Sequence, residues 1–179
     1  MDDVAKHLSM SKRTIYEKFP NKEAIVEILL KEHLKKHLDD CKKYRSAAIN
    51  AIEEIFMMLA PLKELFETIN PRILFELKKF HPLAWKEFTD FKRTTLLESM
   101  IANMKRGIKE GLYREDIDVN ILAILRIEEV EIAWNQEIYP SSKFDLAKVH
   151  VSMLEHFLYG ITNVKGHQIA EKYKKQLKN

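Results

Sequence analysis

Hydroxyl and cationic side chains are dense in a short segment near the start of the chain, from position 11 to position 22. Arginine presents a bidentate fork that matches the edge of a guanine, and lysine and hydroxyl side chains bind phosphate oxygens. These residue types at this density indicate contacts with a nucleic-acid duplex. The candidate residues are Ser11, Lys12, Arg13, Thr14, Tyr16, Lys18 and Lys22.

Two short helices joined by a tight turn are predicted to position these side chains. Residues 2–8 place apolar side chains at spacings of three and four, which is typical of one helix face. Ser11 can cap a second helix, in which Ile15 and Phe19 form an apolar stripe. Pro20 ends that helix because proline lacks an N–H group and clashes with the preceding turn. The layout is that of a helix-turn-helix.

The segment DDVAKHLSMSKRTIYEKFPNKEAIVE resembles the DNA-binding signature of the TetR family of bacterial transcriptional regulators. A modest further match is GLYREDID, from Gly111 to Asp118. Ser9 stands where the family usually has glycine, and a left-handed residue other than glycine costs on the order of 1 kcal/mol. The matching residues of the signature are Ser11, Thr14, Ile15, Tyr16, Phe19 and Lys22.

The resemblance implies a repressor that binds a palindromic operator as a homodimer and is released by a small-molecule effector. Ser11, Lys12, Arg13 and Thr14 would lie at the helix end that reaches base edges, and Tyr16 and Lys22 would contact phosphates. The implied fold is all-α, with a helix-turn-helix DNA-binding module and a C-terminal helical ligand-binding and dimerisation domain of the TetR type.

Family members carry a further helix and loop ahead of the segment that begins here at Met1. That helix completes a three-helix unit. It covers the apolar side of the two helices of the helix-turn-helix, residues 2–19, which we call the reader. We therefore expect the chain to be part of a longer protein. Without such cover, four apolar residues would each lose about 1.5–3 kcal/mol of burial: Val4, Leu8, Ile15 and Phe19.

The composition favours a helical cytoplasmic protein. Only 4 glycines and 5 prolines occur in 179 residues, and β-branched alternation is scarce, which predicts an all-α fold. With 32% charged residues and no apolar run near the length of a membrane span, we expect no membrane association. Cys41 is the single cysteine, so an intrachain disulfide is excluded and a reducing compartment is indicated.

Positive charge is concentrated at the N-terminal end. Residues 1–46 hold 11 Lys and Arg against 8 Asp and Glu, whereas residues 47–164 hold 14 against 18. A basic end on an acidic body favours the approach of that end to a polyanion. Ordinary surface charge is the alternative interpretation.

The helical pattern divides the chain into a DNA-binding region with its linker helix, residues 1–45, and a body, residues 46–179. The linker helix is predicted from Lys22 to about Lys43. In the body we expect a helix over 46–59, which Pro61 interrupts or bends and which then resumes to Ile69. Further helices are expected over 71–80, over 83–110, from Asp116 or Asp118 to about 137, and from Asp145 to Gly160 or beyond. Gly111 is a predicted left-handed cap, and the lysine-rich tail is expected to fray.

Apolar stripes on the last two long helices predict the dimer interface, because resemblance to the family implies a four-helix bundle between two copies. The alternative is that the stripes belong to the core of one subunit. The residues are Ile121, Ile124, Leu125, Ile127, Ile132, Val149, Met153, Leu154, Phe157 and Ile161.

Aromatic and thioether side chains in the middle of the chain suit an apolar effector pocket, and equally an ordinary core. Nothing in the sequence identifies the effector. The candidates are Phe56, Met57, Leu62, Phe66, Phe75, Trp85, Phe88, Met100 and Met104.

His33, His37 and Cys41 recur at intervals of four on the linker helix. Such spacing can supply zinc ligands, but no fourth ligand is evident, and we expect a solvated face, with no metal and no cofactor. The chain contains no Gly-rich phosphate loop, HExxH pattern or GxSxG elbow, so an enzyme is not predicted. The main alternative function is a helical ligand-binding or protein-interaction domain without DNA binding.

Overall fold

The computed structural model describes residues 1–176, apart from the side chains of residues 60, 62–64, 66–68 and 176. Within this part of the chain the fold is all-α, with one isolated bridge between Tyr113 and Thr162. The first helices are α1 (Asp2–His7), α2 (Lys12–Lys18), α3 (Lys22–Ala47), α4 (Ala51–Thr68) and α5 (Ile73–Phe80). They are followed by α6 (Pro82–Phe91), the π-helix η1 (Lys92–Leu96), α7 (Leu97–Lys109), α8 (Val119–Trp134), α9 (Leu146–Ile161) and α10 (Val164–Gln176).

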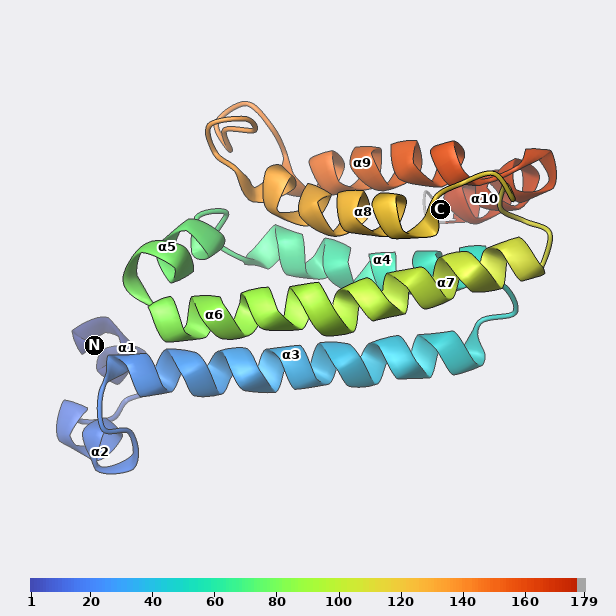
Figure 1. Ribbon diagram of the computed structural model, residues 1–179. Helices are drawn as coiled ribbons and strands as arrows, with labels where there is room; N and C mark the ends of the chain where they lie inside the picture. Colours follow the sequence, from blue (N-terminus) through green and yellow to red (C-terminus); the bar gives the residue numbers. More distant parts are fainter. Residues whose placement is uncertain (177–179) are drawn as a thin grey trace.

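Long helices run roughly side by side, and the two shortest lie at one end (Figure 1). The linker helix α3 extends along the molecule, with α1 and α2 at its beginning and the connection to α4 at its far end. It packs against α6 and α4. On the other side of this layer α8 packs against α7, and α9 packs against α4 and α8. The N-terminal module is therefore joined to the body chiefly through α3.

Side-chain caps fix several helix starts, and those at Ser11, Asp118 and Asp145 agree with the sequence prediction. The Ser11 hydroxyl accepts a hydrogen bond from the N–H of Thr14 at 3.0 Å. Asp118 caps α8 and Asp145 caps α9 in the same way. Gly111 has a φ of 65°, which confirms the predicted left-handed end of the helix before it.

The start of α4 differs from the prediction. A helix was expected from Ser46, but α3 continues to Ala47 and α4 begins at Ala51. The Asn50 side chain accepts hydrogen bonds from the N–H groups of Ile52 and Glu53, and so starts the new helix. The linker helix therefore ends about four residues later than predicted, and α4 begins five residues later.

The prediction that Pro61 interrupts the helix was also wrong, because α4 runs through it without a break. Pro61 is on the exposed side, where it removes one N–H bond but displaces no core contact. The opposite face of α4 is held by buried residues, among them Ile52, Ile55 and Leu59. This packing outweighs the local preference of proline.

The lysine-rich tail does not fray over the part that the structure describes. It forms α10, whose Ala170 is buried against the core. A Cβ atom at Gly166 would lie 2.2 Å from the carbonyl oxygen of Leu112, so only glycine allows this close approach. The helix is held by tertiary packing that its composition does not reveal.

The long helix predicted from Leu83 to Glu110 is observed as α6, η1 and α7 in succession. The π-helix η1 begins at Lys92, whose side chain is only 2% exposed. Its ammonium group lies 2.9 Å from a carboxylate oxygen of Glu128 and also contacts Glu131, both on α8. A buried lysine paired with two partly exposed carboxylates thus ties η1 to α8.

Candidate functional site

The helix α2 buries one side and exposes the other. Ile15 is 4% exposed and anchors the helix, whereas Arg13, Tyr16 and Lys18 are exposed. At its first turn the hydroxyls of Ser11 and Thr14 lie 2.8 Å apart. The exposed face therefore combines cations and hydroxyls at the end of the molecule farthest from α10 (Figure 1).

Two of the candidate cations are held by acidic neighbours on the surface. Lys12 lies 2.7 Å from Asp2, and Arg13 lies 3.2 Å from Glu17. Hydrogen bonding to Lys12 lowers the pKa of Asp2, and the same contact raises the pKa of Lys12. Exposed pairs of this kind are weak, so both cations can exchange these partners for phosphate or base acceptors at little cost.

The turn and the following helix complete the unit. Ser9 has a φ of 53°, the left-handed conformation predicted for the position where glycine is usual. Lys22 is exposed at the first turn of α3, next to its cap Asn21. Free backbone N–H groups at such a helix end add to the attraction for an anion. Val4 and Leu8 are 42% and 52% exposed, in line with the expected loss of shelter. The expectation was wrong for Ile15, which is buried, and for Phe19, which is partly buried.

Polar contacts connect the reader end of α3 to the body. A carboxylate oxygen of Glu23 lies 2.6 Å from Nδ1 of His81, at the junction of α5 and α6. Further along α3, Lys31 lies 3.1 Å from Glu87 on α6. A movement of α6 would therefore reach the N-terminal half of α3 directly.

A partly open cavity of about 130 Å³ lies between α3, α4, η1, α7, α8 and α9. Most of its wall is aliphatic or thioether in character, which suits an apolar ligand. Its lining comprises His37, Cys41, Ile55, Met58, Leu59, Leu96, Ser99, Met100, Asn103, Arg126, Ile127, Val130, His150 and Leu154.

Burial favours the uncharged forms of the two histidines and the cysteine of this cavity. It lowers the pKa of His150 to about 4, with Arg126 as a smaller cause, and it also lowers the pKa of His37. It raises the pKa of the Cys41 thiol to about 11. His37 and Cys41 were expected on a solvated face, but Cys41 is 8% exposed because α3 packs on α4 there.

The residues predicted for an effector pocket do not all meet in one place. Met100 lines the cavity, whereas Phe56 and Met104 are buried in the main core. Phe75 and Trp85 line a separate hollow together with Arg72 and Lys78, and Phe88 packs on Trp85. Met57 is partly buried on α4. The side chains of Leu62 and Phe66 lie outside the described residues.

Sequence reasoning missed the polar lining of the cavity. Arg126 and His150 stand inside stripes that were interpreted only for their apolar members, and His37 and Cys41 were judged exposed. The detectable signal was a charged or ionisable residue inside an otherwise apolar helix face. Burying such residues costs free energy, so their presence on an apolar helix face indicates a candidate ligand contact.

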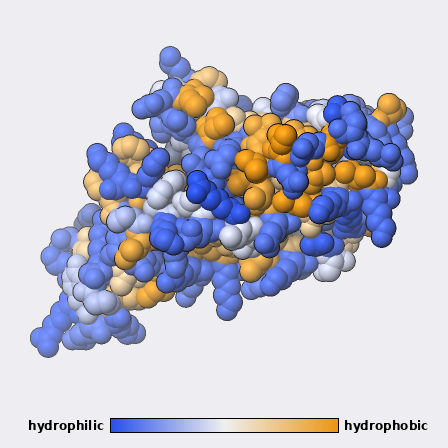
Figure 2. All heavy atoms as spheres, viewed as in Figure 1, coloured by the Kyte–Doolittle hydropathy of each residue, from blue (hydrophilic) through white to orange (hydrophobic). Residues whose placement is uncertain are grey.

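The predicted dimer residues divide into two groups. Ile121, Ile124, Leu125 and Ile132 on α8 are 37–63% exposed, and Figure 2 shows hydrophobic residues gathered over α8 and α9. Met153 is partly buried. The remaining five are buried inside the subunit and are excluded from an exposed face: Ile127, Val149, Leu154, Phe157 and Ile161.

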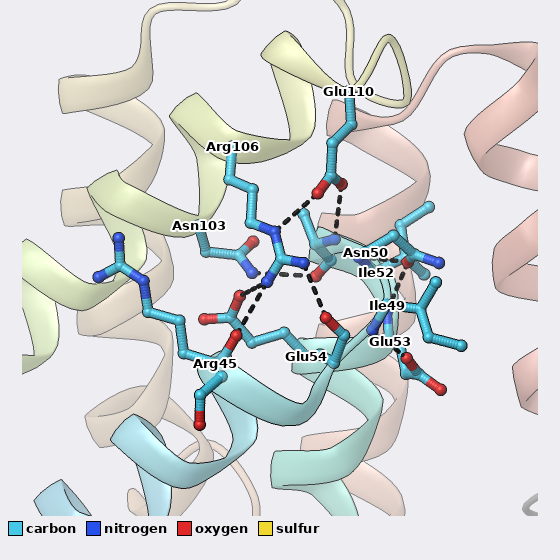
Figure 3. Close-up of polar contacts among 12 residues, drawn as sticks. Arg45, Ile49, Asn50, Ile52, Glu53, Glu54, Asn103, Arg106 and Glu110 are labelled. Atoms are coloured by element: carbon cyan, nitrogen blue, oxygen red, sulfur yellow. Dashed lines mark hydrogen bonds and ion pairs between the residues drawn. The ribbon is translucent and has the colours of Figure 1, made fainter.

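A polar network fastens the connection between α3 and α4 to α7 (Figure 3). The Arg106 guanidinium donates to the backbone carbonyls of Arg45 and Ala48, and to carboxylate oxygens of Glu54 and Glu110. Glu54 is 2% exposed, so its charge depends on this pairing. The far end of α3 is thereby fixed to the body.

The described residues hold no group of three or more His, Cys, Asp or Glu placed to bind a metal ion. None of the described helices is long and apolar enough to cross a membrane.

Comparison with known proteins agrees with this arrangement. Residues 1–29 match the family described as "Bacterial regulatory proteins, tetR family". The HTH-type transcriptional regulator YvaF of Bacillus subtilis (strain 168) is 24% identical over 163 residues, which cover 90% of this chain and 85% of YvaF.

Solved structures share the fold over most of the chain. The ketosteroid transcriptional regulator KstR2 of Mycobacterium tuberculosis superposes with a TM-score of 0.61 at 20% identity, covering 90% of this chain and 83% of KstR2. FadR of Bacillus subtilis, in complex with stearoyl-CoA, gives 0.63 at 19% identity, covering 89% and 87%. The helix-turn-helix segment therefore matches the TetR family over residues 1–29, and the helical body shares the fold of these solved transcriptional regulators.

Proposed function

We propose that the protein is a homodimeric, ligand-responsive repressor that binds a palindromic operator and leaves it when a small-molecule effector binds. The DNA-binding region with its linker is residues 1–45, and the body that binds effector and partner copy is residues 46–179. One short reader grips about one half-site, so two copies are needed for a stable complex.

The exposed face of α2 carries the proposed DNA contacts. Ser11, Lys12, Arg13 and Thr14 lie at its N-terminal end, where side chains reach base edges, and Arg13 is suited to a guanine. Tyr16, Lys18 and Lys22 are assigned to phosphates, which fix register without reading sequence.

The observation that carries this function is that α3 serves both regions. Its first turn carries Lys22 and follows the reader, while His37 and Cys41, farther along the same helix, line the cavity. A ligand in the cavity must contact the helix that holds the reader. Coupling of this kind is worth about 1–3 kcal/mol, or a factor of about 5–150 in operator affinity.

The exposed apolar residues of α8 supply the proposed dimer contact. Ile121, Ile124 and Leu125 share a region of surface next to α9, and burying them against a second copy removes apolar area from water. A two-fold axis through this face would place two readers on successive major-groove faces, about 34–36 Å apart.

Operator binding by the full-length gene product tests the proposal. Fluorescence anisotropy on its own upstream DNA should show specific binding that weakens steeply with salt. The double variant Ile121→Glu/Leu125→Glu should sediment as a monomer and bind at least about tenfold more weakly. Val164→Glu, at an exposed apolar residue outside this face, is the control. Absent or salt-insensitive binding favours the alternative, a helical binding protein that does not act on DNA.

A further inference from the structure

Arg126 is the permanently charged residue among those that line the cavity. Its side chain is 11% exposed, and Nη1 donates to a carboxylate oxygen of Glu129 at 3.0 Å. Its guanidinium carbon lies 5.8 Å from the centre of the Phe157 ring. Its positive charge also contributes to the lowered pKa of His150. Within the described residues, Nη1 makes the side-chain hydrogen bond of Arg126, so the Nε and Nη2 donors remain available to a ligand.

The other polar groups of the wall offer less. The Asn103 amide donates to the carbonyl of Ala51 at 2.9 Å and accepts from the Tyr113 hydroxyl at 3.1 Å, so its strongest sites are already used. The Cys41 thiol is a weak donor, and its sulfur lies 3.7 Å from His37. Compared with Asn103 and Cys41, Arg126 is therefore the stronger hydrogen-bond donor available to a ligand in this cavity.

The charges around the cavity balance. Arg126 is offset by Glu129, which is 13% exposed, and His37, Cys41 and His150 are uncharged near neutral pH because they are buried. A carboxylate entering here would add an uncompensated negative charge to a poorly solvated site. An uncharged acceptor would take the hydrogen bond without that cost.

We propose that the cavity selects an uncharged carbonyl compound, whose oxygen accepts hydrogen bonds from Arg126 while its hydrocarbon part lies along Met58, Leu59 and Met100. Ketones, lactones, esters and thioesters share this chemistry. The assignment rests on the proposed effector role of the cavity and names the class of compound that occupies it.

The volume limits the size of the part that enters. An apolar cavity of about 150 Å³ holds benzene, so a space of about 130 Å³ accommodates a group of about six or seven heavy atoms. Cyclohexanone has an uncharged carbonyl group and is of this size. Methylenecyclohexane has nearly the same shape but lacks the oxygen. Cyclohexanecarboxylate is the negatively charged probe.

Calorimetric titration of the full chain with these three probes tests the proposal. Cyclohexanone should bind at least about tenfold more tightly than methylenecyclohexane or the carboxylate, the gain expected for one hydrogen bond to a charged donor. Equal affinity for cyclohexanone and methylenecyclohexane would refute the role of Arg126 and leave the effector cavity standing. Failure of all three probes to bind would remove the cavity itself as a ligand site.

Two variants separate recognition from folding. Arg126→Met/Glu129→Gln removes the donor without leaving a buried carboxylate alone, and it should abolish the preference for cyclohexanone over methylenecyclohexane. Glu129→Gln alone leaves Arg126 uncompensated, so affinity for cyclohexanecarboxylate should rise at least about tenfold. An unchanged order of the three probes in both variants would overturn the proposal.

The carbonyl can belong to a free small compound or to the acyl end of a carrier thioester. Competition between cyclohexanone and butyryl-CoA distinguishes these sources. Displacement by butyryl-CoA, with release of operator DNA, assigns a carrier thioester, and displacement by small ketones and lactones alone assigns a free compound. Arg114→Met, at an exposed arginine outside the cavity, is the matched control in all arms.

Discussion

The reader and the body use charge in opposite ways. In α2 the cations are exposed and paired with near neighbours in sequence, as Arg13 is with Glu17. In the body, Arg106 and Lys92 join helices far apart in the sequence, and their partners include the almost fully buried Glu54. Exposed local pairs can be exchanged for DNA at little cost, whereas buried pairs hold the architecture and resist removal.

The largest effect should come from breaking the network at the α3–α4 connection. Arg106→Met leaves Glu54 buried without its partner, and we expect a loss of about 3 kcal/mol in the free energy of unfolding. Urea denaturation followed by circular dichroism measures it. Arg114→Met removes an exposed pair with Asp116 and should change stability by less than about 0.5 kcal/mol. Similar losses in the two variants would erase the distinction between the regions.

Lowering the pH should reduce the free energy of unfolding through protonation of His150. Its pKa is about 4 when folded and 6.5 in its ordinary state, because burial disfavours the imidazolium. Stability is therefore unaffected above pH 6.5 and falls by about 1.4 kcal/mol per pH unit as the pH drops toward 4, since only the unfolded chain takes up the proton. Denaturation midpoints measured across this range should show a shallower decline in His150→Gln. His156→Gln, at an exposed histidine, should keep the wild-type slope.

In the reader we expect changes of affinity rather than of stability. Arg13→Ala should cost about 1–3 kcal/mol on the operator and relax its sequence preference, whereas Lys22→Ala should weaken all DNA about equally. Anisotropy on operator and on random DNA distinguishes the two. Equal losses of Arg13→Ala on both DNAs would assign Arg13 to the phosphate backbone.

The smallest effect concerns the turn. Ser9 has a positive φ of 53°, so Ser9→Gly should relieve backbone strain and stabilise the protein by up to about 1 kcal/mol. Ser152→Gly, within α9, should destabilise it by about 0.5 kcal/mol because glycine weakens a helix interior. Thermal unfolding of both variants would show whether the signs are opposite.

The same contrast explains what the sequence could predict. Caps, the turn at Ser9 and the stop at Gly111 depend on neighbouring residues, and these predictions were confirmed. The course of α4 through Pro61 and the helical tail depend on packing partners distant in the sequence, and these predictions failed. The match of the first helices to the TetR family followed from the local motif, and the all-α fold followed from the helical periodicity.

The candidate site shows the same limit. The exposed cations of α2 were identified because their motif is continuous in sequence. The cavity brings together residues from six helical elements, and helix periodicity alone cannot show whether Arg126 points to solvent or to a cavity. Likewise, the stripe of α8 could be divided into exposed Ile124 and buried Ile127 only once its neighbours were placed.

The π-helix η1 has a consequence for how insertions and deletions are tolerated. It joins α6, which packs on α3, to α7, which packs on α8 and α4. Each residue of an α-helix advances the chain by about 100° around the axis, so the extra residue of a π-turn sets the angular phase between these two packing faces. Deleting one residue from η1 would leave the amino-acid composition almost unchanged. It would nevertheless rotate α7 relative to α6, so that both helices could no longer face their packing partners at the same time.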